Sequence, residues 1–321
     1  MKLIKLSDDF SPLHEGVIFG INTESNTPSD VVVEIVDAIK DEVVGTQLLR
    51  GVTYAEVNVA PYVPRFEEYS PVLLSETAFT EAPAAKFKIR VDGIDSEETV
   101  VSVNRGERIT APAVVTSLPL VRRVAYGESV DLLILSEPEQ KVYADINSDM
   151  GDNIYVRHNN PNGAVILSIV TDDFSEETQS IDVKLYCDGE EFASLKCVVD
   201  NPTRTATKLA WVSECGAIEQ YDFPISNRVS HSVERCCVTT SEEVQAVQLK
   251  TKAHISLCSR YEPSAMIESL SQIISSPKVW IKERGEFKRV EVATSTLSHN
   301  LLGKPDLIKL DLSLWQREVS L

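Results

Sequence analysis

One stretch of the sequence carries the residue types and spacing of a calcium site. Asp145 and Asn147 open a D-x-N-x-D run, and oxygen ligands at alternate positions converge on one Ca²⁺ in known calcium-binding loops. The rest of that pattern differs here, because Met150 replaces the tight-turn glycine and Val156 replaces the closing glutamate. We therefore interpret 145–153 as a solvated polar loop between strands, with Ca²⁺ binding as the alternative.

Other motifs of catalytic and nucleotide-binding sites are missing from the sequence. It contains no HExxH pair, no GxSxG turn, and neither a GxGxxG nor a GxxxxGK[ST] loop. The six cysteines form no CxxC pair, and we interpret them as reduced, partly buried thiols. Carboxylates are abundant, so no pair of them stands out as an acid and base. The sequence predicts a protein that is not an enzyme and that has no cofactor.

The formal charge of −18 is large and unevenly spread. Residues 1–110 carry 10 basic and 19 acidic side chains, residues 111–205 carry 7 and 16, and residues 206–321 carry 14 of each. Such an acidic chain is a poor ligand for nucleic acid, because phosphate contacts need clustered Lys and Arg. A neutral final third after two acidic ones is typical of a protein with one end docked on a partner and the other end in solvent. Ordinary variation between domains explains the difference equally well.

Membrane insertion is not expected. Charges interrupt the N-terminal residues MKLIKLSDD, so the apolar core of a secretory signal is missing from them. No apolar run approaches the roughly 20 residues that cross a bilayer. We expect synthesis in a host cytoplasm.

The elements of the chain are predicted to be mostly strands. Val, Ile and Leu dominate the aliphatic residues, and many short windows alternate between apolar and polar positions. Three segments are expected: β-sandwiches over 1–110 and 111–205, and a β-rich domain over 206–321. In the first segment the strand candidates are 16–21, 30–37, 56–62 and 85–91, separated by turn residues.

The second segment has strand candidates at 129–135 and 164–170 and a clear hairpin over 181–199. In that hairpin Ile181, Val183 and Leu185 share one face, and Asp188-Gly189 is a preferred two-residue turn. The pattern is typical of immunoglobulin-like sandwiches.

The third segment contains one predicted helix, near 263–274. Pro263 suits the first helical position, and an apolar stripe follows through Met266, Leu270 and Ile273. A hairpin over 279–292, turning near Arg284-Gly285, and a last strand over 306–315 complete this domain.

The start of the third segment carries a group of spaced aromatic residues. Trp211 ends an apolar strand, Gly216 permits a turn with positive φ, and Tyr221 and Phe223 stand two apart on one face of the next strand. From the residues alone, these four are the structural signature of the domain core, without a role in chemistry.

This pattern resembles one found in tail and other virion proteins of phages that infect Bacteroides-type bacteria, including crAss-like phages. There a strand ending in Trp-aliphatic-Asn leads into Gly-Gly, an acidic residue and spaced aromatics. Here Ser213 replaces the Asn and Ala217 replaces the second Gly. The segment Val57–Tyr62 is similar to an Asn-x-Ala/Ser-Pro-Tyr stretch of the same group.

The resemblance implies a virion structural protein of the tail, baseplate or adaptor region. Its partners would be other virion proteins and copies of itself. We expect Trp280, Phe287 and Trp315 to form its docking surface, with membership of the core as the alternative for each. The alternative function is a bacterial surface or carbohydrate-binding protein made of immunoglobulin-like modules.

Overall fold

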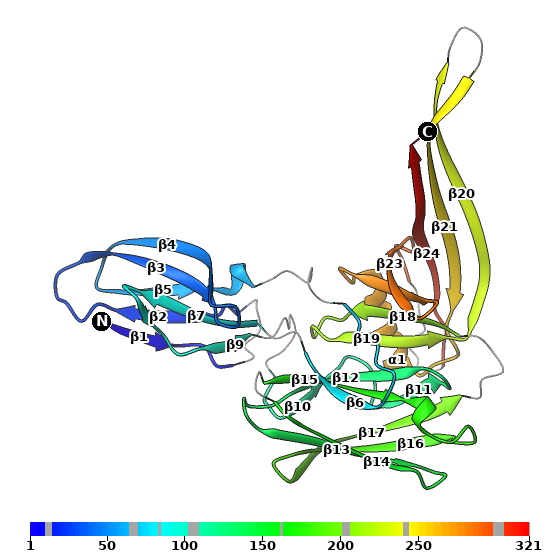
Figure 1. The fold of residues 1–321 in the computed structure, drawn as a ribbon, viewed down its shortest axis with the longest axis horizontal. Coiled ribbons are helices and arrows are strands. Elements are labelled where there is room, and N and C mark those ends of the chain that lie inside the picture. The colour runs from blue at the N-terminus through cyan, green and yellow to red at the C-terminus, as the bar shows by residue number, and fades with distance from the viewer. Residues whose placement is uncertain are drawn as a thin grey trace.

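The chain folds into three β-rich units and a projecting β-arm (Figure 1). The computed structural model describes residues 1–9, 15–63, 70–82, 85–101, 109–160, 163–200, 206–239, 244–297 and 305–320. Within strands, the side chains of 85, 225–228, 233–239, 244–251 and 314–320 are not described. The chain is mainly β and consists of consecutive β-sandwich domains followed by a sheet domain with one short helix, as the sequence predicts.

The first unit is a sandwich of two antiparallel sheets, ordered β1-β2-β5 and β4-β3-β7-β8, with β9 also pairing β7. Its strands are β1 (Lys2–Lys5), β2 (Ile18–Asn22), β3 (Ser29–Asp37), β4 (Glu42–Val52), β5 (Tyr54–Asn58), β7 (Ala85–Val91), β8 (Ile94–Asp95) and β9 (Thr99–Val101). Phe19 of one sheet and Ile35 and Phe87 of the other lie in the same core. The candidate 56–62 is only partly a strand, because a 3₁₀ turn occupies Ala60–Tyr62.

One strand of the first predicted segment belongs to the second unit. β6 (Ala78–Glu81) pairs with β15 (Ala164–Val170), after which the chain returns to the first sandwich as β7. Thr77 secures this crossing, since its hydroxyl accepts a hydrogen bond from the Val170 amide at 3.0 Å. One strand from the range 1–110 therefore lies in a sheet of the second unit, which no local pattern in the sequence reveals.

The second unit is a sandwich whose sheets are ordered β10-β12-β15-β6 and β11-β17-β16-β13-β14. Its remaining strands are β10 (Ala113–Val115), β11 (Val121–Ala125), β12 (Ser129–Leu135), β13 (Lys141–Ser148), β14 (Asn153–Asn159), β16 (Ser180–Cys187) and β17 (Glu190–Asp200). The chain enters through β10 in one sheet and passes to β11 in the other, where it runs parallel to β17. The strands predicted at 129–135 and 164–170 are confirmed.

The predicted hairpin over 181–199 is also confirmed. Cys187 pairs with Glu190 across the Asp188-Gly189 turn, and both turn residues have positive φ. Ile181, Val183 and Leu185 are buried, as their shared face requires.

The third unit is a seven-stranded antiparallel sheet ordered β19-β18-β22-β23-β24-β21-β20. Its strands are β18 (Thr207–Val212), β19 (Ile218–Phe223), β20 (Ile225–Thr239), β21 (Val244–Cys258), β22 (Val279–Glu283), β23 (Glu286–Val292) and β24 (Lys309–Ser320). The helix α1 (Ser264–Ser271) and a 3₁₀ turn (Gln272–Ile274) contribute Met266, Ile267, Leu270 and Ile273 to the core. The predicted helix and the hairpin over 279–292 are thus confirmed, while Pro263 caps the helix instead of starting it.

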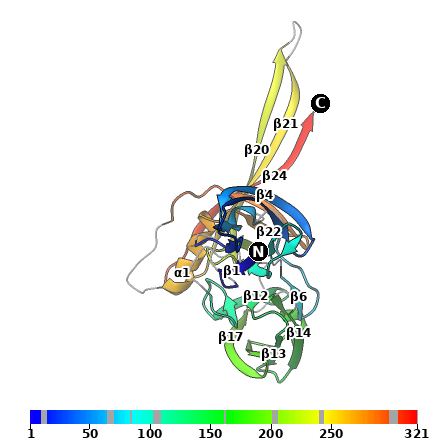
Figure 2. The ribbon, with the colours of Figure 1, turned by 90° about the vertical axis from the view of Figure 1, so that its left-hand side faces the viewer.

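The far halves of β20, β21 and β24 form an arm that leaves the body of the molecule. Figures 1 and 2 show it standing away from all three units, with the end of β24 lying along it. β20 and β21 have 15 residues each, which corresponds to about 50 Å of strand. We define the arm as residues 233–239, 244–251 and 316–320, beyond the pair Ser232–Lys252.

Candidate functional site

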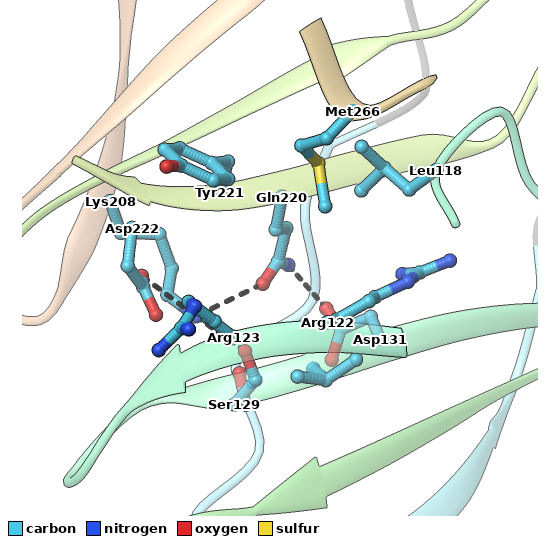
Figure 3. Close-up of a pocket in the computed structure, with 11 residues that line it drawn as sticks. Leu118, Arg122, Arg123, Ser129, Asp131, Lys208, Gln220, Tyr221, Asp222 and Met266 are labelled. Atoms are coloured by element: carbon cyan, nitrogen blue, oxygen red, sulfur yellow. Dashed lines mark hydrogen bonds and ion pairs between the residues drawn. The ribbon is translucent and has the colours of Figure 1, made fainter. Parts of the chain in front are cut away.

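Charged side chains are buried where the second sandwich meets the sheet of the third unit (Figure 3). We call this cluster the ionic junction; it comprises Glu128, Asp131, Lys208, Asp222, Arg122 and Glu219. β18 and β19 contribute Lys208 and Asp222, which are direct cross-strand partners. β12 and the turn before it contribute Asp131 and Glu128. The strand alternation that buries Leu209 and Trp211 on one face of the sheet turns Lys208 toward the sandwich.

Lys208 is the centre of the junction, and only 2% of its side chain is exposed. Its Nζ lies 3.4 Å from Glu128 Oε2 and 3.5 Å from Asp222 Oδ1. It donates hydrogen bonds to the Ser129 carbonyl and to Gln220 Oε1. These contacts join strands of the third unit to the sandwich through one cation.

Asp131 lies in the middle of an apolar strand and is buried. Its carboxylate accepts hydrogen bonds from Ser168 Oγ at 2.6 Å and from the Gln220 side-chain amide. Burial raises the pKa of Asp131, against the lowering effect of the Ser168 hydrogen bond and of the Lys208 charge. Burial likewise raises the pKa of Asp222, again opposed by Lys208.

A second ion pair connects Arg122 of β11 with Glu219 of β19. The two side chains are 5% and 2% exposed, and the closest charged atoms are 3.6 Å apart. Glu219 also accepts a hydrogen bond from the Ser117 amide at 2.8 Å, and Arg122 donates to Thr116. The segment before β11 is thereby held against the third unit.

The space enclosed by the ionic junction is too small for a substrate. The cavity beside Lys208, Asp131 and Met266 measures about 10 Å³, which is at the lower limit for a single water molecule. Buried ionic groups without substrate access can fix the relative position of two domains but cannot carry out a reaction. Sequence reasoning did not find this site, although a charge inside an apolar strand such as β12 was an available signal, since buried Asp and Lys are rare unless paired.

The pH dependence of stability should reveal the buried Asp131. Because its pKa is raised by folding, the folded state binds a proton more tightly, and stability falls as pH rises from about 4 through the folded pKa. Replacing Asp131 with Asn should flatten that part of the stability curve, measured by urea unfolding at several pH values. Asp182→Asn, at an exposed position, serves as the control and should leave the slope unchanged. An unaltered slope in Asp131→Asn contradicts the assignment.

The four signature residues fall where the sequence places them. Trp211 and Phe223 are fully buried and Tyr221 is 5% exposed, all within the core of the third unit. Tyr221 meets Phe223 edge-on, with ring centroids 4.8 Å apart, and donates a hydrogen bond to Glu262 at 2.9 Å. Gly216 has φ +84° in the turn between β18 and β19.

Two of the three expected docking residues, Trp280 and Phe287, pack in a cluster of the third unit. Trp280 is only 6% exposed and packs with Ala210 and Val212, while Phe287 is partly buried against the same cluster. The expectation for Trp280 is corrected, because its strand position turns the indole into the interior. The side chain of Trp315 lies outside the described residues.

The run 145–153 is part of a β-hairpin and not a calcium loop. β13 and β14 pair up to Asn147–Asn153, so only 149–152 form the turn, with Gly151 at φ +93°. Asp145 accepts hydrogen bonds from the side-chain amides of Asn147 and Asn153 at 3.1 and 3.0 Å. Among the described residues, no group of three or more His, Cys, Asp or Glu is placed to hold a metal ion. The cysteines at 187, 197, 215 and 258 are free thiols.

The fold and the ionic junction together define a multidomain β-sandwich protein in which the strand β6 links the first two units and buried charges join the second unit to the third. No protein-family model matches the chain, and no curated protein matches it. No helix in the described part of the chain is long and apolar enough to cross a membrane.

Several solved structures show a distant likeness. The chain is similar to the chicken interferon gamma receptor alpha chain, with 10% identity and a TM-score of 0.20 over 61% of this chain and 97% of that one. It is similar to the FN1–FN3 domains of chicken CNTN1, with 10% identity and a TM-score of 0.18 over 79% and 91%. A Salmonella alpha-2-macroglobulin gives 9% identity and a TM-score of 0.23, and the match spans 20% of its length. With TM-scores this far below 0.5, these matches carry no argument about this chain.

Proposed function

We propose that this chain is a structural subunit of a phage virion, in the tail, baseplate or adaptor region. It acts by assembling with copies of itself and with other virion proteins, without catalysing a reaction. The observation that carries this proposal is the arm, because a ribbon of paired strands that projects from the body presents its outer edges to a partner.

The arm offers backbone groups to a partner. β20 is the last strand of its sheet and pairs only with β21. β24 pairs with β23 only near Ser313, so its outer edge has no described strand partner along the arm. Unpaired edges of this kind are templates for strand addition. Neither β20 nor β21 contains the Pro or Gly that would interrupt pairing along its length.

The body behind the arm is suited to a static role. The ionic junction fixes the third unit on the second sandwich, and β6 ties the first unit to the second. The spaced aromatics Trp211, Tyr221 and Phe223, which carry the resemblance to phage virion proteins, build the core from which the arm extends. A rigid body with a projecting ribbon favours ring or tube assembly, in which one surface of each copy meets a different surface of the next.

Removing the arm should abolish self-assembly while leaving the body folded. Ser232 and Lys252 are direct cross-strand partners, so Asn-Gly can replace 233–251 as a two-residue hairpin turn, and the chain can end at Trp315, the partner of Lys252 on β24. We expect the full chain to form oligomers in sedimentation velocity at micromolar concentration and the trimmed variant to be monomeric. Circular dichroism and the melting temperature report whether the body is intact.

A matched variant separates the strand edges from the four residues that connect β20 to β21 in the sequence. Replacing 240–243 with Gly-Ser-Gly-Ser keeps both strands and should assemble like the full chain. A full chain that stays monomeric, or a trimmed chain that still assembles, contradicts the proposal.

A further inference from the structure

The outer face of the larger sheet in the second sandwich carries three tyrosines in contact. Tyr143 of β13 stacks on Tyr186 of β16, with centroids 4.9 Å apart and ring planes 9° apart. Tyr155 of the edge strand β14 lies 5.6 Å from Tyr143 and is tilted by 42°. Tyr155 is 58% exposed, so one side of this row is open to solvent.

An ordered polar cluster adjoins the open end of the row. Asp145 is the cross-strand partner of Tyr155, and Asn147 faces Asn153 one step further along the same face. Both amides donate to one carboxylate oxygen, Asp145 Oδ1, and Asn153 also donates to Asn147 Oδ1. Among the described residues, the other Asp145 oxygen accepts no hydrogen bond. The three side chains are thus held in place before any ligand arrives, which lowers the entropy lost on binding.

The phenol groups of this row differ from other phenols of the chain. Tyr54, Tyr62 and Tyr221 each share a hydrogen bond with a neighbouring side chain. In the part of the chain that the structure describes, no hydrogen bond engages the phenols of the three stacked tyrosines. Their rings contribute apolar surface, and their hydroxyls are donors and acceptors that a ligand can use.

The chemistry of this face selects the class of ligand. A purely apolar ligand would strip water from the Asp145 carboxylate without replacing its hydrogen bonds. A polyanion is repelled by the 7 basic and 16 acidic side chains of 111–205. A neutral carbohydrate avoids both the desolvation cost and the charge repulsion. Its C–H faces lie against aromatic rings, and its vicinal hydroxyls form hydrogen bonds with carboxylate and amide groups.

We propose that Tyr155, Asp145, Asn147 and Asn153, with Tyr143 behind them, form a binding site for a neutral glycan. The site lies on the second sandwich, apart from the arm, and does not depend on the assembly proposed above. The D-x-N spacing of Asp145 and Asn147 then has its explanation in a strand, where alternate residues share one face.

Affinity electrophoresis tests the site directly, because the acidic full chain migrates well in native gels. Dextran, laminarin, yeast mannan, xylan and arabinogalactan are cast in separate gels, and we expect at least one of them to retard the chain. Tyr155→Ala and Asn153→Ala should each weaken that retardation at least tenfold, with little change in melting temperature. Tyr261→Ala, at a tyrosine 73% exposed on another unit, should bind like the unaltered chain.

Each outcome decides the question. Retardation that is lost in Tyr155→Ala and kept in Tyr261→Ala supports the site. Absence of retardation by all five polysaccharides overturns it, and so does retardation that survives both substitutions on the face. Assembly measured in parallel by sedimentation shows whether the variants still oligomerise, so that a failure of this site is distinguishable from a failure of the arm.

Discussion

Replacing Trp211 with alanine should destabilise the chain by about 3–5 kcal/mol, the range for truncating a large aromatic side chain in a core. Trp211 is fully buried in the core of the third unit, together with Leu209 beside it on β18 and Met266 and Leu270 of α1. The substitution leaves a cavity that the sheet cannot close, because β18 is held by β19 on one side and β22 on the other. Urea unfolding followed by circular dichroism measures the loss.

A matched variant isolates the source of this effect. The indole nitrogen of Trp211 is buried and has no described hydrogen-bond partner. Trp211→Phe therefore removes no hydrogen bond and keeps most of the ring volume, so it should cost clearly less than Trp211→Ala. Equal losses in the two variants would contradict a cavity as the cause. Tyr261→Ala, on the exposed surface, should be close to neutral.

Replacing Lys208 with methionine should lower the free energy of unfolding by about 3–5 kcal/mol at neutral pH. Removing one partner of a buried ion pair leaves uncompensated charge in the interior. Asp222 is 7% exposed and Glu128 is 20% exposed, so water can restore little of the lost solvation. Since protonated carboxyls need no cation, the loss should shrink as the pH is lowered. Urea unfolding of the variant and the unaltered chain at pH 4 and pH 7 measures both effects.

The partners of Lys208 provide the control. Glu128 keeps a second cation, Lys282, at 2.7 Å, whereas the contact left to Asp222 among the described residues is the hydrogen bond from the Ala125 amide at 2.9 Å. The double variant Lys208→Met with Asp222→Asn should therefore recover much of the stability lost in the single one. Lys196→Met breaks an exposed pair with Asp182 and should cost less than about 1 kcal/mol. If Lys208→Met costs as little as Lys196→Met, the ionic junction contributes little to stability.

Local sequence patterns were sufficient to predict many elements of the fold. The hairpin over 181–199, the helix beginning at Ser264 and the hairpin over 279–292 each combine a regular apolar period with strong turn or cap residues. The same reasoning placed Trp211, Tyr221 and Phe223 in the core. In each case the pattern that predicts the structure lies within one short segment, although the residues that bury it come from distant parts of the chain.

Features that depend on distant partners were missed. The arm was not predicted, because nothing in the sequence of 225–258 shows how far β20 and β21 extend from the body. Residues 145–148, the end of β13, were interpreted as part of a polar loop, although Val142, Ala144 and Ile146 alternate with outward residues along this strand. The ionic junction required the third unit to be placed on the second sandwich, which no local pattern can do.

The pairing of β6 with β15 of the second unit has a consequence for folding during translation. Ala78 of β6 pairs with Ser168, which the ribosome makes 90 positions later (168 − 78). At usual elongation rates of about 5–20 residues per second, β6 waits roughly 5–20 s for its partner. During that interval β6 is unpaired. In the sequence it lies between β5 and β7, which belong to the two sheets of the first sandwich. A chaperone that shields 70–82 at this stage would act at the moment when the chain is most exposed to aggregation.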